Sequence, residues 1–174
     1  MSKLAGEQYC RSFTELYGFE TVILRYFNVF GPRQNPKSEY AAVVPKFIHL
    51  VLSHSPPTIN GDGSQTRDFT YVENVVQANL LACEREGVTG RVFNIATGQQ
   101  VALIDMLRTV ERITGIHVEP DFLPRRMGDV EHSLAAIDEA RKSLGYEPTV
   151  NLEEGLRRTV QAVRDVLAGG ASAA

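Results

Sequence analysis

The sequence predicts an α/β protein, and three observations carry that prediction. A helix-forming segment that stops at Gly18 runs directly into Thr21–Phe27, a β-rich run typical of a buried strand in a parallel sheet. A second unit of strand followed by helix occupies residues 91–115. At 174 residues and 43% hydrophobic content, the chain can form one core and one domain. A parallel sheet needs several such units, so most of the sheet is expected to lie outside this chain.

Six helices are expected in chain order: residues 4–17, 40–54, 72–86, 104–113, 133–144 and 152–167. Gly18, Gly115 and Gly145 are the expected stops. Ser133 is the expected N-cap of the fifth helix, and Asn151 with Glu154 predicts a capping box for the sixth. On the third helix, the apolar face is expected to consist of Val72, Val75, Val76, Leu80 and Cys83.

Five strands are expected beside these helices. They are Thr21–Phe27, closed by the breaker Gly31-Pro32, then Thr58–Ile59, Phe69–Tyr71, Arg91–Ala96 and the weakly alternating edge strand His117–Leu123. Between the second and third strands, Gly61 and Gly63 flank Asp62, which predicts a tight turn. Arg67 follows that turn. Its planar guanidinium suits a phosphate, although pairing with Asp62 or Asp68 is the alternative.

Composition excludes several classes of function. The net charge is -3 and the basic residues are scattered, so neither nucleic acid nor a membrane surface is an expected partner. No signal peptide or membrane-spanning run is recognisable, and a cytoplasmic location is the expectation. Cys10 and Cys83 are too few for a disulfide framework and fit a reducing compartment. The four histidines share no ligand spacing, so no metal site is expected.

Four motifs carry a resemblance to a known family. They are Met-Ser-Lys-Leu-Ala-Gly-Glu at the start, Arg-Tyr-Phe-Asn-Val-Phe-Gly-Pro-Arg-Gln from residue 25, Gly-Asp-Gly-Ser-Gln-Thr-Arg-Asp-Phe from residue 61, and Arg-Arg-Met-Gly-Asp-Val from residue 125. In this order they resemble the C-terminal half of nucleotide-sugar epimerases and dehydratases, which are extended short-chain dehydrogenases. Tyr-Ala-Ala-Val-Val-Pro-Lys-Phe from residue 40, followed by Ile-Asn-Gly-Asp-Gly, is most similar to UDP-hexose and UDP-N-acetylhexosamine 4-epimerases.

The resemblance implies a fold and a division of the chain. The fold would be the C-terminal part of a Rossmann-type sheet plus a smaller mixed α/β substrate-binding subdomain. Residues 1–34 would be the remnant of the dinucleotide-binding domain, and residues 35–168 would bind the nucleotide sugar. Residues 169–174, small side chains only, would form a disordered tail.

The resemblance also implies NAD as cofactor and a catalytic Tyr-x-x-x-Lys pair. Lys3 matches the lysine, which would hold the cofactor and lower the pKa of the tyrosine. The tyrosine would fall before Met1, and the glycine-rich dinucleotide fingerprint is expected outside the chain too. Met1 would then be either an internal methionine or the edge of a truncation.

Substrate-binding residues follow by resemblance, position by position. Asn28 would lie against the diphosphate or sugar, Arg67 and Arg126 would clamp the phosphates, and Asp129 would accept from a ribose hydroxyl or orient Arg126. Val43, Val44 and Phe47 would wall the uracil, with core packing as the alternative. Asn60 stands where much of the family has an aromatic residue, and it would bond the base or only start the turn.

The implied function is the substrate-binding part of a UDP-sugar 4-epimerase that works through a transient 4-keto sugar. Without the tyrosine and the fingerprint, the chain alone is expected to be inactive. A non-catalytic nucleotide-sugar binder, or part of a 4,6-dehydratase or 4-reductase, remains an alternative. Unpartnered helix and strand surfaces would expose an apolar patch. The complete enzyme could pair as a homodimer.

Overall fold

The computed structural model describes residues 2–35 and 43–171. The described elements are α1 (Ser2–Tyr17), β1 (Ile23–Tyr26), β2 (Val29–Phe30), α2 (Val43–Leu52), β3 (Thr58–Asn60), β4 (Thr66–Arg67), β5 (Thr70–Tyr71), α3 (Val72–Glu84), β6 (Val92–Ile95), β7 (Val101–Ala102), α4 (Leu103–Thr114), β8 (Asp121–Leu123), α5 (Asp138–Leu144) and α6 (Leu152–Ala171). The chain combines helices with strand pairs that are mainly parallel, which confirms the expected α/β class. The first turn expected for the second helix, residues 40–42, lies outside the described residues, as does the end of the expected tail.

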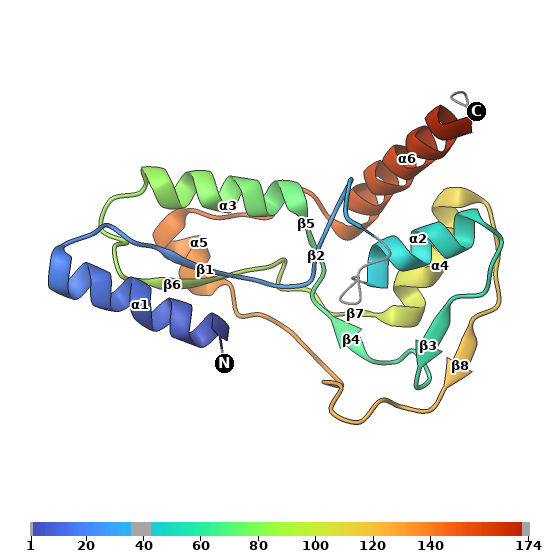
Figure 1. The fold of residues 1–174 in the computed structure, drawn as a ribbon, viewed down its shortest axis with the longest axis horizontal. Coiled ribbons are helices and arrows are strands. Elements are labelled where there is room, and N and C mark those ends of the chain that lie inside the picture. Colours follow the sequence, from blue (N-terminus) through green and yellow to red (C-terminus); the bar gives the residue numbers. More distant parts are fainter. Residues whose placement is uncertain (1, 36–42, 172–174) are drawn as a thin grey trace.

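One region is built on the parallel pair of β1 and β6, in which Ile23 lies opposite Val92 (Figure 1). Behind β6, α3 and α5 close a core cluster of buried residues: Val75, Ala78, Val88, Phe93, Ile95, Ala140, Leu144 and Tyr146. On the other side lies α1, which buries no residue. Polar contacts hold it instead: Glu7 accepts from Arg25 of β1 at 2.8 and 2.6 Å.

The second region contains α2, α4 and α6 (Figure 1). Its core cluster is larger and consists of Phe30, Val44, Phe47, Ile48, Val51, Ile59, Phe69, Tyr71, Met106, Leu107, Val110, Val118, Val150, Leu156 and Val160. Two short strand pairs border it, β3 with β8 in parallel and β4 with β7 antiparallel. Because these pairs join distant segments, the region brings residues near 60 beside residues near 123.

Helix ends largely follow the sequence signals. Gly115 and Gly145 end α4 and α5 with positive φ angles of 75° and 72°. At the start of α6, Asn151 Oδ1 accepts from the backbone N–H of Glu154 at 2.9 Å, the bond expected of a capping residue. α6 extends through Ala171, so the first three residues of the expected tail are helical.

Two expectations about helices are wrong. α3 buries Asn74, Val75 and Ala78, whereas Val72, Val76, Leu80 and Cys83 of the expected inner face are exposed. The reason is a buried polar contact, because the Asn74 amide bonds the backbone of Thr149 and Val150 and fixes the helix rotation. Ser133 does not cap α5, because its N–H donates to Thr66 O and the segment extends beside β4.

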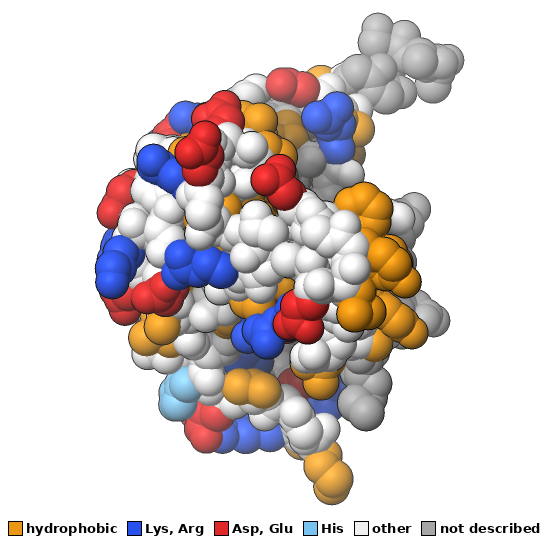
Figure 2. Space-filling model, turned by 90° about the vertical axis from the view of Figure 1, so that its left-hand side faces the viewer, with side chains coloured by type: hydrophobic (Ala, Val, Ile, Leu, Met, Phe, Trp, Pro, Cys, Tyr) orange, Lys and Arg blue, Asp and Glu red, His pale blue; other side chains and the backbone are white. Residues whose placement is uncertain are grey.

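The outer edge of β1 has no partner strand among the described residues. Of this strand, which was expected to be buried, only Ile23 is buried, and Arg25 and Tyr26 are exposed. Large hydrophobic side chains of α1 and the turn after it are also exposed: Leu4, Tyr9, Phe13, Leu16, Tyr17 and Phe19. Figure 2 shows hydrophobic side chains gathered along one side of this end of the molecule. In the described residues, no helix combines the length and the apolar character required to cross a membrane.

Candidate functional site

The first component of the candidate site is a segment that we call the turn wall, residues 60–67. Asp62 Oδ1 accepts from both the N–H and the hydroxyl of Ser64, at 3.0 and 2.6 Å, which closes an Asx turn. The glycines on either side have φ of 84° and 82°, a conformation that glycine adopts without strain. Gly63 is buried against Ile104, whose N–H donates to the Gly63 carbonyl at 3.1 Å. The turn wall is therefore anchored on the start of α4.

The second component is the loop wall, residues 124–131, in which every residue is exposed. Backbone bonds hold it near its two ends. Gly61 N–H donates to Leu123 O at 2.7 Å, and Thr66 N–H donates to Glu131 O at 3.0 Å. Between these ends, Arg125 pairs with Glu131 at 2.8 Å and approaches Asp62 at 3.8 Å. The loop wall thus rests on the turn wall through exposed polar contacts.

A cavity of about 90 Å³ separates the two walls. It is lined by Asn60, Gln65, Arg125, Arg126, Asp129, Val130 and Glu131. Three residues expected from the sequence, Asn60, Arg126 and Asp129, therefore share one cavity although they come from distant segments. Gln65 donates to the Asn60 carbonyl at 2.7 Å and so fixes the turn-wall side.

Some charged groups at and beside the cavity are paired and others are not. A hydrogen bond from Arg125 holds the pKa of Glu131 below its ordinary value, and the hydroxyl of Ser64 does the same for the pKa of Asp62. Both carboxylates are therefore negative at neutral pH, and both face Arg125. Arg126 has no ion pair with any residue that the structure describes. Its guanidinium is therefore free of the carboxylates that the structure describes.

Arg67 lies at the end of the turn wall and is half-buried. Its Nη1 donates to the carbonyls of Thr66, at 2.8 Å, and Glu131, at 3.3 Å. Pairing with Asp62 or Asp68, the alternative drawn from the sequence, is not observed in the described part of the chain. Through Glu131, Arg67 contacts a residue that lines the cavity.

Asn28 lies at the bend between β1 and β2 with a φ of 36°, a left-handed conformation uncommon outside glycine. Its side-chain N–H donates to the carbonyl of Asp68 at 2.9 Å, so Asn28 is tied to the residue after Arg67. The side chain is exposed on its other side. Its amide oxygen accepts no hydrogen bond from the described residues.

The remaining expected site residues lie elsewhere. Val44 and Phe47 belong to the core with 1% of their surface exposed, and Val43 packs beside it. Core packing accounts for these positions, and contact with a base stays a prediction. Lys3 is exposed in the first turn of α1, where it lines a different cavity of about 550 Å³ beside β1.

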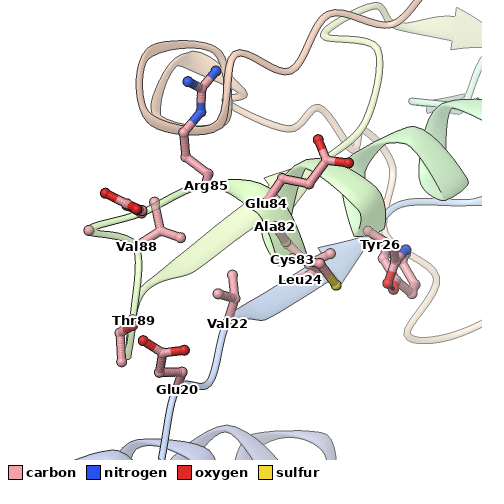
Figure 3. A pocket seen from close by; sticks show the side chains of 13 residues that line it. Glu20, Val22, Leu24, Tyr26, Ala82, Cys83, Glu84, Arg85, Val88 and Thr89 are labelled. Carbon is pink, nitrogen blue, oxygen red and sulfur yellow. Dashed lines mark hydrogen bonds between the residues drawn. The ribbon is translucent and has the colours of Figure 1, made fainter.

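A larger hollow, about 720 Å³, lies between β1 and α3 (Figure 3). Three carboxylates line it, those of Glu20, Glu84 and Glu86. The one guanidinium in its lining, that of Arg85, is committed to the carbonyl of Leu144 at 3.1 and 3.3 Å. This electrostatic environment disfavours an anion, so size alone does not identify the site.

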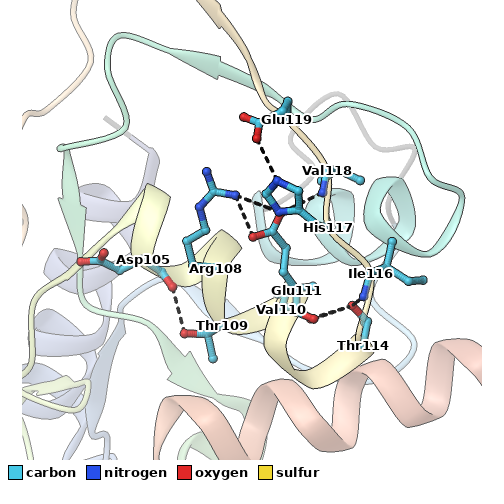
Figure 4. A network of polar contacts seen from close by, with 10 residues as sticks. All are labelled: Asp105, Arg108, Thr109, Val110, Glu111, Thr114, Ile116, His117, Val118 and Glu119. Atoms are coloured by element: carbon cyan, nitrogen blue, oxygen red, sulfur yellow. Dashed lines mark hydrogen bonds and ion pairs between the residues drawn. The ribbon is translucent and has the colours of Figure 1, made fainter.

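A polar network supports the chain before the loop wall (Figure 4). Glu111 of α4 is buried, and its carboxylate accepts from Arg108 at 2.8 Å and from the N–H of Val118 at 2.9 Å. Burial raises the pKa of Glu111, but the Arg108 and Val118 hydrogen bonds outweigh it, and the pKa lies below its ordinary value. His117 adds a contact to Glu111 at 3.0 Å. The network fixes the approach to β8.

Four residues of the cavity lining did not emerge from the sequence: Gln65, Arg125, Val130 and Glu131. Gln65, Arg125 and Val130 lie inside the quoted motifs, so the motifs contained them but could not show their contacts, whereas Glu131 lies just outside. Among the described residues, no three His, Cys, Asp or Glu side chains are grouped so as to hold a metal ion.

Together, these observations define an α/β protein whose polar cavity holds a guanidinium with no ion pair among the described residues. The chain belongs to the NAD dependent epimerase/dehydratase family, which matches residues 1–96. A curated relative, a putative UDP-glucose 4-epimerase of Methanocaldococcus jannaschii, is 38% identical over 165 residues, 95% of this chain and 52% of the relative.

Solved structures agree with this family. The chain is 42% identical to a UDP-glucose 4-epimerase of Thermotoga maritima crystallised with UDP-glucose, with a TM-score of 0.89 over 94% of this chain and 52% of that one. It is 34% identical to a UDP-glucuronic acid 4-epimerase of Bacillus cereus in complex with UDP-glucuronic acid and NAD, with a TM-score of 0.85 over 94% and 51%. The chain therefore spans about half the length of these relatives.

Proposed function

We propose that this chain is the nucleotide-sugar-binding portion of a UDP-sugar 4-epimerase. One observation carries the proposal: Asn60 of the turn wall and Arg126 and Asp129 of the loop wall line a single cavity. Asn60 lies far along the sequence from the motif that contains both Arg126 and Asp129. Family membership and the relatives crystallised with UDP-sugars support the same reading.

Chemistry assigns a role to each side chain. Arg126, which carries no ion pair within the described residues, would bind the diphosphate through parallel charge-assisted hydrogen bonds. Asp129 would accept from a ribose hydroxyl, since a carboxylate is a strong acceptor. Arg67 already bonds two carbonyls, so it would add positive potential and hold the loop wall more than it would chelate phosphate.

Cavity size sets a condition on binding. Pockets for small ligands measure roughly 300–1,000 Å³, far more than the volume of about 90 Å³ between the walls. UDP would therefore have to displace the loop wall outward and separate Arg125 from Asp62. The contact that opens is a 3.8 Å pair between exposed groups, which contributes little to stability.

The residues of this chain do not by themselves fit NAD. Lys3 is the one position that matches the family's cofactor contacts, and the pair Gly61 and Gly63 leads into a strand instead of opening a helix. The chain's own residues would bind and orient the nucleotide, and we expect no conversion of UDP-glucose or UDP-N-acetylglucosamine by this chain alone.

Calorimetric titration of the purified chain with UDP tests the proposal. We expect saturable binding of UDP and at least tenfold weaker binding of uridine, because the diphosphate supplies the charge-assisted contacts. Arg126→Ala should weaken UDP binding about 10- to 100-fold, in keeping with the loss of a charged hydrogen-bonding partner. Arg141→Ala serves as the control. It removes an exposed arginine of α5 that pairs with Glu147.

The outcomes separate clearly. Equal affinities for UDP and uridine, or equal effects of Arg126→Ala and Arg141→Ala, would contradict the proposed site. Measurable epimerisation of UDP-glucose by the chain would contradict the expectation that it only binds. UDP binding without turnover is the result that the alternative from the sequence, a non-catalytic nucleotide-sugar binder, also predicts for this chain.

A further inference from the structure

Asp68 is a fully buried carboxylate, although its neighbour Arg67 does not pair with it. Its Oδ1 accepts from the N–H and the hydroxyl of Thr97, at 2.9 and 2.6 Å. Its Oδ2 accepts from Gly98 N–H at 2.9 Å and from Ala135 N–H at 3.5 Å. Four donors from two distant segments thus converge on one side chain.

These contacts join the segments that carry the candidate site. Thr97 and Gly98 follow the carboxyl end of β6, and Asn28, which donates to the Asp68 carbonyl, follows the carboxyl end of the parallel strand β1. Ligands of open α/β sheets bind at this edge. Ala135 lies four residues after the loop wall ends, and Arg67 immediately precedes Asp68.

We propose, on the basis of the proposed function, that Asp68 is a positioning residue for the nucleotide site. It does not reach the cavity, whose lining does not include it. Its carboxylate ties the backbone that carries Arg67 to Thr97–Gly98 and to the return of the chain from the loop wall, while its backbone carbonyl accepts from Asn28. A carboxylate suits this role because it only accepts hydrogen bonds, and the donors around it come from two separate segments, Thr97–Gly98 and Ala135.

Other hydrogen-bonded carboxylates do not combine these properties. Glu111 holds the approach to the loop wall from α4, but its contacts are to Arg108, His117 and Val118, on one side of the cavity only. Asp62 lies on the turn wall itself and is exposed. Asp68 alone of these three links β1, β6, the turn wall and the chain beyond the loop wall.

The test compares Asp68→Ala with Asn74→Ala in the full chain. Asn74 is also fully buried and makes four hydrogen bonds, to Thr149 and Val150, which lie in neither wall. Asp68→Ala should weaken UDP binding at least tenfold and speed tryptic cleavage after Arg125 and Arg126 at least fivefold. Asn74→Ala should lower the melting temperature about as much as Asp68→Ala does. It should change UDP affinity and the rate of tryptic cleavage by less than twofold.

A milder pair keeps the test decisive if Asp68→Ala does not fold. Thr97→Val removes only the hydroxyl that donates at 2.6 Å, whereas Thr97→Ser retains it. We expect Thr97→Val to weaken UDP binding about threefold and Thr97→Ser to restore it.

Equal effects of the Asp68 and Asn74 variants on cleavage and on UDP binding would reduce Asp68 to a general fold stabiliser and overturn the proposal. Unchanged cleavage and binding in both Thr97 variants would do the same. If the unmodified chain binds no UDP, the proposed function fails, whereas the cleavage comparison still decides whether Asp68 holds the loop wall.

Discussion

The two walls of the cavity differ in how they are held. The turn wall buries Gly63 against Ile104, receives two backbone bonds from α4 and continues into the buried Asp68. The loop wall is exposed throughout and pairs with the turn wall through Arg125. If UDP binds between the walls as proposed, we expect the turn wall to be organised beforehand and the loop wall to adjust to the ligand. Rigid placement reduces the entropy lost on binding, and a movable wall admits the ligand.

The largest effect is expected when a glycine of each wall is replaced by alanine. Gly63 of the turn wall and Gly128 of the loop wall both have positive φ angles, 82° and 88°. A Cβ at Gly63 would lie 3.1 Å from Ile104 Cβ, whereas a Cβ at Gly128 would have nothing within 4 Å. Gly63→Ala should lower the free energy of unfolding by about 2–4 kcal/mol, from backbone strain plus crowding. Gly128→Ala should cost about 1 kcal/mol, from strain alone. Urea unfolding curves measure both, and equal losses would break the distinction between the walls.

An intermediate effect is expected at Glu111, which supports the approach to the loop wall. Glu111→Gln should lower the free energy of unfolding at pH 7 by about 1–2 kcal/mol, because the partly buried hydrogen bond from Arg108 loses the charge of its acceptor. The pKa of Glu111 is depressed in the folded state, so its contribution is present above its ordinary value of 4.5 and is lost as pH falls through the folded value.

Urea unfolding at several pH values between neutral and acidic checks this sign. The difference between the native protein and the Glu111→Gln variant should shrink below pH 4.5. A difference that grows on acidification would show that Glu111 is not stabilised as a carboxylate.

The smallest effect is expected at Glu131, because its ion pair with Arg125 is exposed. Glu131→Gln should leave the melting temperature within about 1 °C and change UDP affinity less than threefold. Arg125 depresses the pKa of Glu131, so the pair persists above the ordinary carboxyl pKa of 4.5 and is lost as pH falls through the folded value. High salt should affect the unmodified protein as Glu131→Gln does, because it screens the same ion pair. A tenfold loss of UDP affinity in Glu131→Gln would contradict the expectation that the loop wall is loosely held.

Local signals in the sequence identified most of the fold. Glycine stops, the Asn151 cap and the turn at Gly61 to Gly63 depend on neighbours in the chain, and each was found where expected. The inner face of α3 could not be predicted this way. Its orientation depends on Asn74 bonding to residues near 150, whereas the apolar residues at periodic positions point outward.

The candidate site, too, was predictable from the sequence only in part. Family motifs indicated Asn60, Arg126 and Asp129, which share the cavity. The contacts of Arg125 and the buried position of Asp68 depend on segments brought together only in space, so no local pattern could show them. Arg67 was selected for its charge, yet the structure commits part of its guanidinium to backbone carbonyls.

The strand pairing has a consequence for the kinetics of folding. Each of the four described pairs joins distant parts of the sequence, such as residue 23 with 92 and residue 58 with 121, and none is a hairpin. Long loops must close before any of these pairs gains stability, and chains rich in such contacts fold over milliseconds to seconds. Helices α4 and α6 can form first from local contacts. We therefore expect the two walls to come together late in folding, when β3 pairs with β8.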